Sequence, residues 1–303
     1  YGLEQGYFVA LCDNITARKR EEIRKNATVE LLRICNEAQS VDELLSRTAR
    51  FFRDLSCCEA IGIRLRSGDD YPYCETIGLS EAFVDTQRGL CDRGVRDPQG
   101  GASLYCLCGE VIFGRCPKEA ACTQRGSYWT ANGTTEIEGY GKCRCHSYGY
   151  RSLALVPLHS HGERIGLFQF SDRRPGLVSA EKVALYEDLV DYIAISFSKL
   201  KADQALLEAS QYNEQIIAGA QEGIIVYDRE LRYQVWNPYV EHLTGLKQAD
   251  VLGKHPLEAF PFLKEVGAFD RIEAALAGEN PAPLDFPYHH PRTGRSGWLS
   301  DAS

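Results

Sequence analysis

The stretch RSLALVPLHSHGERIGLFQFSD, residues 151–172, decides the fold of the first part of this 303-residue chain. Two apolar runs flank the polar segment HSHGE, a pattern that is typical of two strands joined by a hairpin turn. The segment EAIGIRLRSG, residues 59–68, has the alternation of a further strand and ends in a Ser-Gly turn, and residues 41–55 have a helical period. These patterns predict an α+β fold with antiparallel sheets flanked by helices.

Length, charge and hydropathy limit the class of protein. A chain of 303 residues is about twice a typical domain, so we expect two domains. A net charge of −8 without a basic run argues against nucleic acid as a partner. Apolar runs stay well short of the roughly 20 residues of a membrane helix, and the first residues lack a signal-peptide pattern. We therefore expect a cytoplasmic protein, without membrane contact in this part, whose partner is a small molecule or a protein.

Two long helical segments flank the predicted sheet. The first begins at Thr16, which can cap it, and carries many charges up to about residue 40. The second, residues 179–220, opens with a capping pattern at Ser179 and has apolar residues every three or four positions. A helix of this length extends beyond one domain, either as a solvated linker or as a dimeric coiled coil that carries a signal. We expect the coiled coil.

Cysteines concentrate in one region. Of the twelve cysteines, seven lie between Cys91 and Cys145. Because cytosolic thiols stay reduced, metal binding or redox chemistry is favoured over a disulfide framework. In an extended chain, residues i and i+2 point to one side, so Cys106 with Cys108 and Cys143 with Cys145 could each direct two thiolates at one ion. Together these four sulfurs could form a tetrahedral metal shell.

Residues 223–255, GIIVYDRELRYQVWNPYVEHLTGLKQADVLGKH, resemble a PAS domain, a small sensory α+β fold. The resemblance extends over residues 212–303, and within it Trp236 and Asn237 take family positions for packing and for a turn contact beside the ligand pocket. The segment LCDNITARKREE, residues 11–22, resembles the end of a PAS domain. It implies that residues 1–15 hold the terminal strand of another, truncated PAS domain.

The middle of the chain, about residues 28–200, resembles a cysteine-bearing subgroup of GAF domains. The blocks that carry the resemblance are LC at 90–91, CLCGEVIFGR at 106–115, GSYWTANGTTE at 126–136, CHSYGYRSLALVPL at 145–158 and IGLFQFSDRRPG at 165–176. It implies a GAF domain at residues 41–200, with a linker helix at 16–40 before it and a helical linker at 201–211 after it. Tyr128 and Trp129 lie in the segment that covers the ligand pocket of GAF folds.

The GAF resemblance also implies a ligand set. Its recurring cysteine positions are Cys91, Cys106, Cys108 and Cys145. Cys143, which the spacing indicates but which does not fall on these positions, and His146 are alternate ligands. Zinc suits four thiolates and would staple a long loop, whereas an iron–sulfur cluster would make the site a redox sensor. Haem, with His146 or a cysteine as axial ligand, reversible thiol chemistry, and thiols without a ligand remain alternatives.

These resemblances imply the sensory input region of a bacterial signal-transduction protein, a sensor histidine kinase or a diguanylate cyclase. We expect a homodimer in which a small-molecule signal, a metal or the redox state changes the packing of helices 16–40 and 181–218, and so controls a downstream kinase or cyclase output domain. Kinase motifs and a glycine-rich phosphate loop are absent from the sequence, so this region is expected to be non-catalytic. Alternatives are a PAS–GAF scaffold with a zinc staple and a thiol-dependent GAF-fold reductase of free methionine sulfoxide.

Overall fold

The computed structural model describes residues 13–86, 89–96, 102–104, 106–115, 122–133, 136–137, 141–142, 144–160, 162–289 and 293–301. The chain divides into two compact units, Tyr1–Asp203 and Gln204–Ser303. Both units combine helices with antiparallel strands, so the predicted α+β class is confirmed. The strand predicted within residues 6–15 lies almost wholly outside the described residues, as do Cys12, Cys116 and Cys143.

A five-stranded antiparallel sheet forms the centre of the first unit, in the order β2-β1-β9-β8-β5. The predicted hairpin is β8 (Ser152–Ser160) and β9 (Glu163–Asp172). On the other side of β9 lie β1 (Ala60–Leu65) and then β2 (Tyr73–Ile77), while the short β5 (Tyr128–Thr130) pairs with β8. All six residues of β1 are buried, which explains why its sequence is apolar on both faces.

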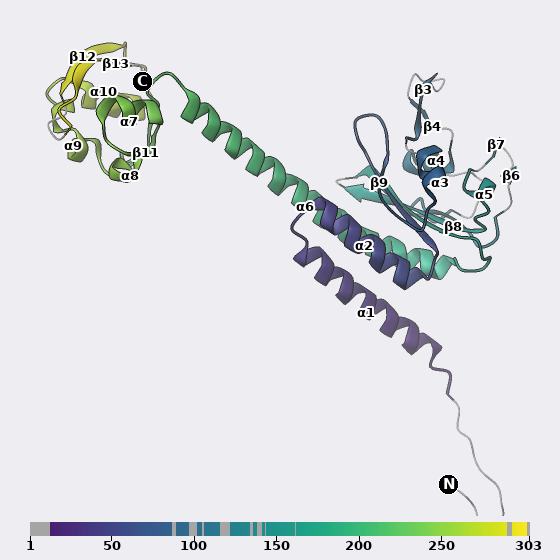
Figure 1. Cartoon of the computed structure of the whole chain (residues 1–303). Helices are drawn as coiled ribbons and strands as arrows, with labels where there is room; N and C mark the ends of the chain where they lie inside the picture. The colour runs from purple at the N-terminus through teal and green to yellow at the C-terminus, as the bar shows by residue number, and fades with distance from the viewer. Residues whose placement is uncertain are drawn as a thin grey trace, which may run out of the picture. The chain divides into compact units, whose positions relative to one another are not determined.

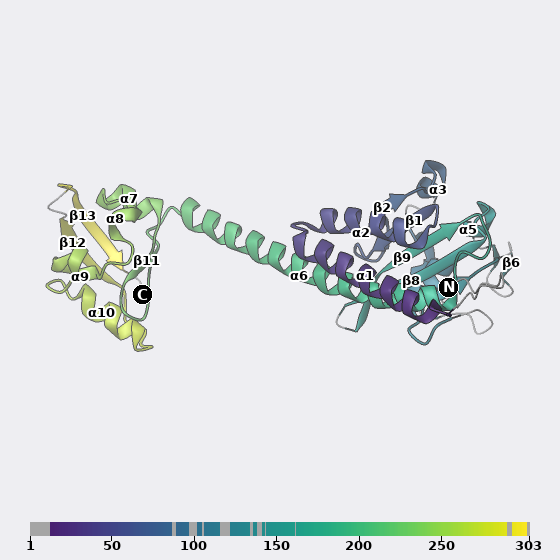
Figure 2. The same cartoon turned by 90° about the horizontal axis from the view of Figure 1, so that it is seen from below.

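Helix α2 (Val41–Ser56) and the first part of α6 (Ala180–Gly219) cover one face of this sheet, and α1 (Thr16–Glu37) packs on their far side, as Figures 1 and 2 show. Phe168 and Phe170 of β9 point to this face, where both pack at 5.3 Å between ring centres against Phe52 of α2. Because side chains alternate along a strand, Gln169 lies on the opposite face.

The opposite face carries α3 (Glu81–Thr86), α4 (Leu107–Ile112) and α5 (Arg144–Ser147). Two short strand pairs accompany them, β3 (Cys91–Arg96) with β4 (Ala102–Leu104) and β6 (Glu136–Ile137) with β7 (Gly141–Lys142). The expectation of extended chain at the paired cysteines holds for the backbone of Cys106 but is wrong at Cys108 and Cys145. Cys106 is the N-cap residue of α4, Cys108 lies within that helix, and Cys145 lies in α5.

The two long helices start differently. At α1, the expected Thr16 cap is wrong: Thr16 is the first helical residue, and its amide donates to Asn14 Oδ1 at 3.1 Å. At α6, Ser179 caps the helix as predicted, since its hydroxyl accepts from the amide of Lys182 at 3.4 Å. Arg20 of α1 pairs with Glu181 of α6 at 2.9 Å, and apolar residues of α1 enter the core of the helical layer. Helix α1 therefore packs as part of the first unit.

The second unit contains two short antiparallel pairs, β10 (Ile225–Tyr227) with β11 (Tyr233–Trp236) and β12 (Leu284–His289) with β13 (Ser296–Asp301). Between them lie α7 (Pro238–Thr244), α8 (Gln248–Val251), α9 (Pro256–Ala259), the 3₁₀ helix η1 (Pro261–Leu263) and α10 (Ala268–Leu276). The core of this unit gathers around aromatic residues, among them Tyr233, Trp236, Phe260 and Phe269.

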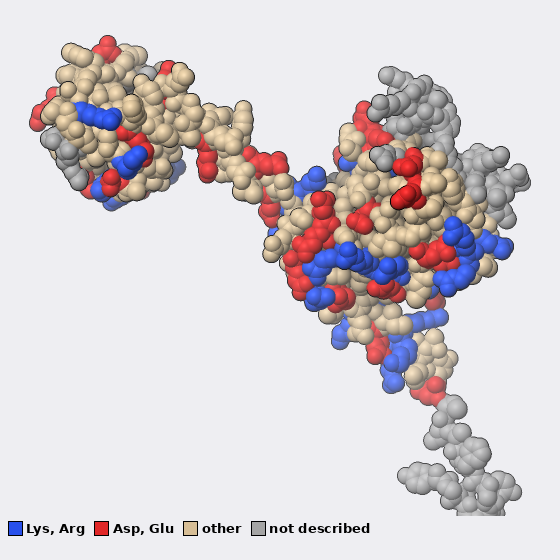
Figure 3. Space-filling model, viewed as in Figure 1, with Lys and Arg blue, Asp and Glu red and all other residues tan. Residues whose placement is uncertain are grey.

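Acidic and basic side chains are interspersed over the first unit on the face that Figure 3 shows. Several of them form ion pairs along the helices, such as Arg33 with Glu37 at 2.9 Å and Arg47 with Glu37 at 2.6 Å. Within the described residues, every helix is too short or too polar to cross a membrane.

Candidate functional site

Three cysteines meet on the face of the sheet opposite α2. Cys106 and Cys108 come from α4, and Cys145 comes from α5. The Cys108 sulfur takes part in hydrogen bonds with both Cys106 and Cys145, and all three carry thiols rather than disulfides. Cys108 and Cys145 are each 2% exposed, whereas Cys106 is only half-buried. The structure thus brings together three of the predicted site residues; we name them the cysteine cluster.

Gln169 of β9 lies beneath the cysteine cluster and is fully buried. Its amide nitrogen donates to Cys145 Sγ at 3.7 Å and to Ser171 Oγ at 2.9 Å. Its amide oxygen accepts a long bond from Cys108 Sγ at 4.0 Å and a short one from the Tyr73 hydroxyl at 2.6 Å. One amide therefore contacts two sulfurs that are far apart in the sequence, which fixes their positions.

A buried arginine adds positive charge next to this face. Arg64 of β1 is 1% exposed and donates to the carbonyl of Tyr71 at 2.8 Å. Its guanidinium carbon lies 3.5 Å from the centre of the Tyr73 ring, a cation–π contact that a buried site strengthens. Since Tyr73 also bonds to Gln169, the contacts run from Arg64 through Tyr73 to the cysteine cluster.

These surroundings change the acidity of the cysteine cluster. Hydrogen bonds from Cys106 and Cys145 hold the pKa of the Cys108 thiol well below its usual value, and the charge of Arg64 acts in the same direction against the effect of burial. Burial raises the pKa of Tyr73, which Arg64 partly offsets. The contacts with Cys106 and Cys145 therefore favour the thiolate of Cys108, the form that attacks electrophiles and binds soft metals, whereas only the protonated thiol can donate the long bond to Gln169.

The chemistry of three sulfurs suits zinc or an iron–sulfur cluster, but their arrangement is not that of a finished metal site. Among the residues that the structure describes, no three His, Cys, Asp or Glu side chains form a group that could hold a metal ion. The side chain of Cys91 and the whole of Cys143 fall outside that part. Metal binding by the cysteine cluster thus remains a proposal.

His146 follows Cys145 and is 4% exposed. Its Nδ1 lies 2.6 Å from the carbonyl oxygen of Tyr150, so Nδ1 carries the proton and donates it. Its Nε2 is buried without a hydrogen-bond partner within the described part of the chain. A side chain at position 133 would collide with this ring, since a Cβ there would lie 1.9 Å from His146 Cε1. Gly133 therefore allows the imidazole to pack at this place.

The predicted pocket residues of β5 lie on opposite faces of the sheet. Tyr128 is 5% exposed and belongs to the same apolar cluster as Cys108 and Cys145. Trp129 is half-buried and packs against the core beneath the helical layer. Tyr128 and Trp129 do not line one cavity together, because neighbouring residues of a strand point in opposite directions.

The segment 122–127, which precedes β5, is tied to α6. Thr123 donates through its hydroxyl to the buried Glu187, and Arg125 pairs with Asp188 at 2.8 Å and with Asp191. Arg24 of α1 also pairs with Asp188, at 2.5 Å. Polar contacts thus connect this part of the cysteine-rich region to α6, and Asp188 of α6 is in turn paired with α1. Cys122 itself forms a disulfide, so the expectation that thiols of this region stay reduced does not hold for this cysteine.

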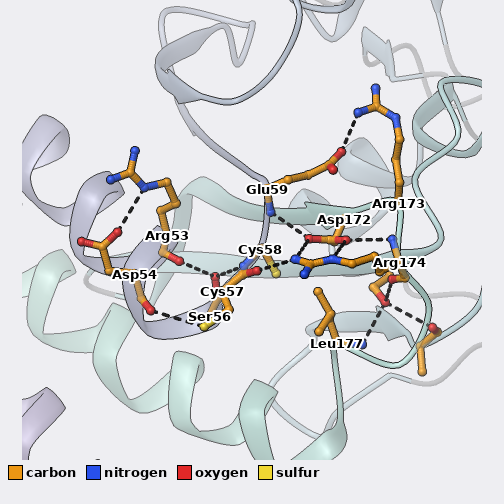
Figure 4. A network of polar contacts seen from close by, with 12 residues as sticks. Arg53, Asp54, Ser56, Cys57, Cys58, Glu59, Asp172, Arg173, Arg174 and Leu177 are labelled. Atoms are coloured by element: carbon orange, nitrogen blue, oxygen red, sulfur yellow. Dashed lines mark hydrogen bonds and ion pairs between the residues drawn. The ribbon is translucent and has the colours of Figure 1, made fainter.

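A second polar network joins the end of β9 to the residues between α2 and β1 (Figure 4). Asp172, at the end of β9, is fully buried and accepts from the amides of Glu59 at 2.9 Å and Arg174 at 2.7 Å. The Arg174 guanidinium contacts the same carboxylate at 2.8 Å and the carbonyl of Cys57 at 2.9 Å. Cys57 is exposed and has a positive φ of 57°. The network fastens the start of β1 to the end of β9.

In the second unit, Trp236 and Asn237 have packing and capping contacts. Trp236 is 2% exposed, stacks on Phe260 and donates from its indole to the carbonyl of Leu246 at 3.2 Å. Asn237 caps α7 by accepting from the amide of Val240 at 3.2 Å, and it also accepts from the amide of Ile224 at 3.1 Å. These contacts account for both side chains without a ligand.

Comparisons with known proteins address the two units separately. The family model of the PAS fold matches residues 211–282, which confirms the resemblance stated for this stretch. A comparison with curated proteins gave no significant match. Solved structures similar to the chain include GAF domains and related folds.

Three of these structures illustrate the range. The GAF domain of a phosphoenolpyruvate-protein phosphotransferase from Coxiella burnetii is 16% identical, covers 63% of this chain and 99% of its own, and has a TM-score of 0.45. The free methionine-R-sulfoxide reductase from Neisseria meningitidis is 13% identical over 65% of this chain and 97% of its own, with a TM-score of 0.42. A domain of a two-component sensor histidine kinase protein from Sinorhizobium meliloti is 17% identical over 55% and 96%, with a TM-score of 0.39. At these identities the likeness is one of fold.

Proposed function

We propose that this chain is the sensory input region of a bacterial, cytoplasmic signal-transduction protein, and that the cysteine cluster receives the signal. In this proposal, a change at the cluster alters the packing of α1 and α6 in a homodimer and so controls a histidine kinase or cyclase output domain. The PAS match supports a signalling role for the second unit.

One observation carries the proposal. The segment 122–127, within the cysteine-rich region, is bonded to Glu187, Asp188 and Asp191 of α6. Helix α6 then continues without a break to Gly219, past the first residue of the PAS match at 211. A helix transmits a shift at one end to the other, provided that the signal stabilises one of its arrangements more than another.

The sensed group is either a metal or the thiols themselves. Cys106, Cys108 and Cys145 would hold zinc or iron with Cys91, Cys143 or His146 as further ligand, and such a metal would supply structural bracing or a redox centre. The thiol-to-thiol and thiol-to-amide contacts favour the metal-free thiols as the sensing state.

The test starts with anaerobic purification, followed by metal analysis and an absorption spectrum. Hydrogen–deuterium exchange is then compared, in peptides from 122–133 and 180–219, between reduced, oxidised and metal-loaded protein. We expect exchange in α6 to differ between at least two of these states. Identical exchange of α6 in all three states would show that the cluster sends no signal through this helix.

A further inference from the structure

The three thiols of the cysteine cluster differ in access to solvent. Cys106 is half-buried, whereas Cys108 and Cys145 are each 2% exposed. A dissolved oxidant therefore reaches Cys106 first. The two inner sulfurs are shielded by apolar neighbours that include Leu107 and Val111.

The contacts of the three sulfurs run in the order of their exposure, from Cys106 to the buried pair. Cys108 and Cys145 lie in one buried cluster, against which the partly buried Cys106 packs, and both Cys106 and Cys145 act on the pKa of the Cys108 thiol. Gln169 contacts both inner sulfurs, at 4.0 Å from Cys108 and 3.7 Å from Cys145. The sulfurs thus form a series that runs from a half-buried thiol to a fully buried pair held by one amide.

We infer that the cysteine cluster is a thiol relay that takes oxidising equivalents from a hydroperoxide at Cys106 and stores them as a buried Cys108–Cys145 disulfide. The inference rests on the proposed function, because it specifies the signal received at the same cluster. It assigns Cys106 as the entry residue, Cys108 as the central residue and Cys145 as the end of the relay.

The relay proceeds in three steps, in which atoms and electrons balance. The Cys106 thiol attacks the hydroperoxide, whose O–O bond breaks to give Cys106 sulfenic acid and an alcohol, or water when the oxidant is hydrogen peroxide. The Cys108 thiol then displaces water from that sulfenic acid and forms the Cys106–Cys108 disulfide. Finally, Cys145 attacks Cys108 by thiol–disulfide exchange, which forms the Cys108–Cys145 bond and returns Cys106 as a thiol. One peroxide is reduced by two electrons, and two thiols are oxidised.

Gln169 has a positioning role in the last step. Its amide nitrogen donates to Cys145 and its oxygen accepts from Cys108, so the two sulfurs stay adjacent while the bond moves inward. The product would link α4 to α5, two helices that the polypeptide itself connects only through a long segment. The covalent link restricts that whole segment, which includes Thr123 and Arg125.

The experiment uses the full chain, reduced and desalted without oxygen, with its metal content measured first. The protein is treated with one equivalent of hydrogen peroxide, quenched with an alkylating reagent at timed intervals, and mapped by peptide mass spectrometry. We expect the Cys108–Cys145 disulfide as the final product. Cys145→Ser should stop at the Cys106–Cys108 disulfide, and Cys106→Ser should slow the appearance of Cys108–Cys145 about tenfold or more, since access limits thiol oxidation.

Controls separate the relay from general thiol damage. Cys74→Ser removes an exposed thiol of β2 and should oxidise like the unmodified protein. Cys106→Ala repeats the key variant with a different side chain, and exchange of β8 and β9 peptides verifies that each variant is folded. An unchanged rate in both Cys106 variants overturns the inference. A final disulfide that joins Cys106, Cys108 or Cys145 to any cysteine outside the cluster overturns it as well, whereas the disulfide of Cys122 is mapped separately and does not count.

The relay and the sensory function can fail independently. Formation of the Cys108–Cys145 disulfide without a change in α6 exchange would support the relay and contradict the proposed sensory role. A metal-dependent change in α6, together with thiols that form no disulfide, would support the sensory role and overturn the relay.

Discussion

Replacing Arg125 with alanine should release the segment 122–127 from α6 without unfolding the first unit. Arg125 pairs with Asp188 and Asp191 and also donates to the backbone carbonyl of Glu187 at 3.2 Å. The arginine is 39% exposed and the carboxylates 37% and 50%, so solvent screens both pairs. We assign about 0.5 kcal/mol to each ion pair and about 1 kcal/mol to the carbonyl bond, or about 2 kcal/mol together.

Hydrogen–deuterium exchange measures this loss locally. A change of about 2 kcal/mol in the local opening free energy corresponds to about 30-fold faster exchange in peptides from 122–130. Peptides from β8 and β9 should keep their protection, and peptides from 225–236 in the second unit serve as an internal reference. Arg53→Ala is the matched control, because Arg53 pairs only at the surface with its neighbour Asp54.

Two results would refute the reasoning on Arg125. One is unchanged exchange in 122–130, and the other is an equal effect of Arg53→Ala. A double-mutant cycle with Asp191→Ala adds a further check, since contacting residues should show a coupling of about 0.5 kcal/mol rather than additive effects.

Three further predictions concern single buried polar residues. Gln169→Leu should reduce the yield of the Cys108–Cys145 disulfide about fivefold after peroxide treatment while Cys106 oxidises normally, as measured by peptide mass spectrometry; an unchanged yield would remove Gln169 from the relay. Although burial opposes it, the bonds from Arg174 keep the pKa of Asp172 below its usual value, so its stabilising effect is present above about pH 4 and is lost as the pH falls through the lowered value. Urea unfolding of the first unit should therefore depend more steeply on pH between about 5 and 3 in the original chain than in Asp172→Asn, and equal slopes would contradict this. Asn237→Ala should destabilise the second unit alone by about 3 kcal/mol, seen as faster exchange in β11 peptides, because it leaves two backbone amides without their acceptor; a similar loss in β8 would refute it.

The sequence predicted the elements whose hydrophobic period is undisturbed. The hairpin of β8 and β9 follows from two apolar runs around a polar turn, and the long helix α6 follows from a helical repeat and the Ser179 cap. The cap of α1 was mispredicted because Asn14 lies two residues earlier and bonds to the first helical amide instead. The segment 86–149 gave no regular period, so α4 and α5, each one or two turns long, could not be foreseen.

In the candidate site, too, some residues could be recognised from the sequence and others could not. Cysteine spacing pointed to Cys106, Cys108, Cys143 and Cys145, and the GAF resemblance implied Cys91 in place of Cys143, so that Cys106, Cys108 and Cys145 were common to both sets. Gln169 and Arg64 were missed because a single polar residue in an apolar strand does not reveal which face it occupies or what it meets there. Their signal was a polar residue at a position where the pattern demands burial, which implies a buried partner.

In the proposed function, the signal must move the first unit where movement costs least. The faces of the sheet are packed by fully buried residues such as Phe52 and Phe168, so displacing them would cost several kcal/mol each. By contrast, the ion pairs of Arg125 and Arg24 with Asp188 are partly exposed and cost about 1 kcal/mol or less to break. A new bond inside the cysteine cluster can therefore shift the segment 122–127 against α6 while the sheet stays intact. The weak contacts at Asp188, rather than the core, are then the place where the state of the cysteines reaches the helix.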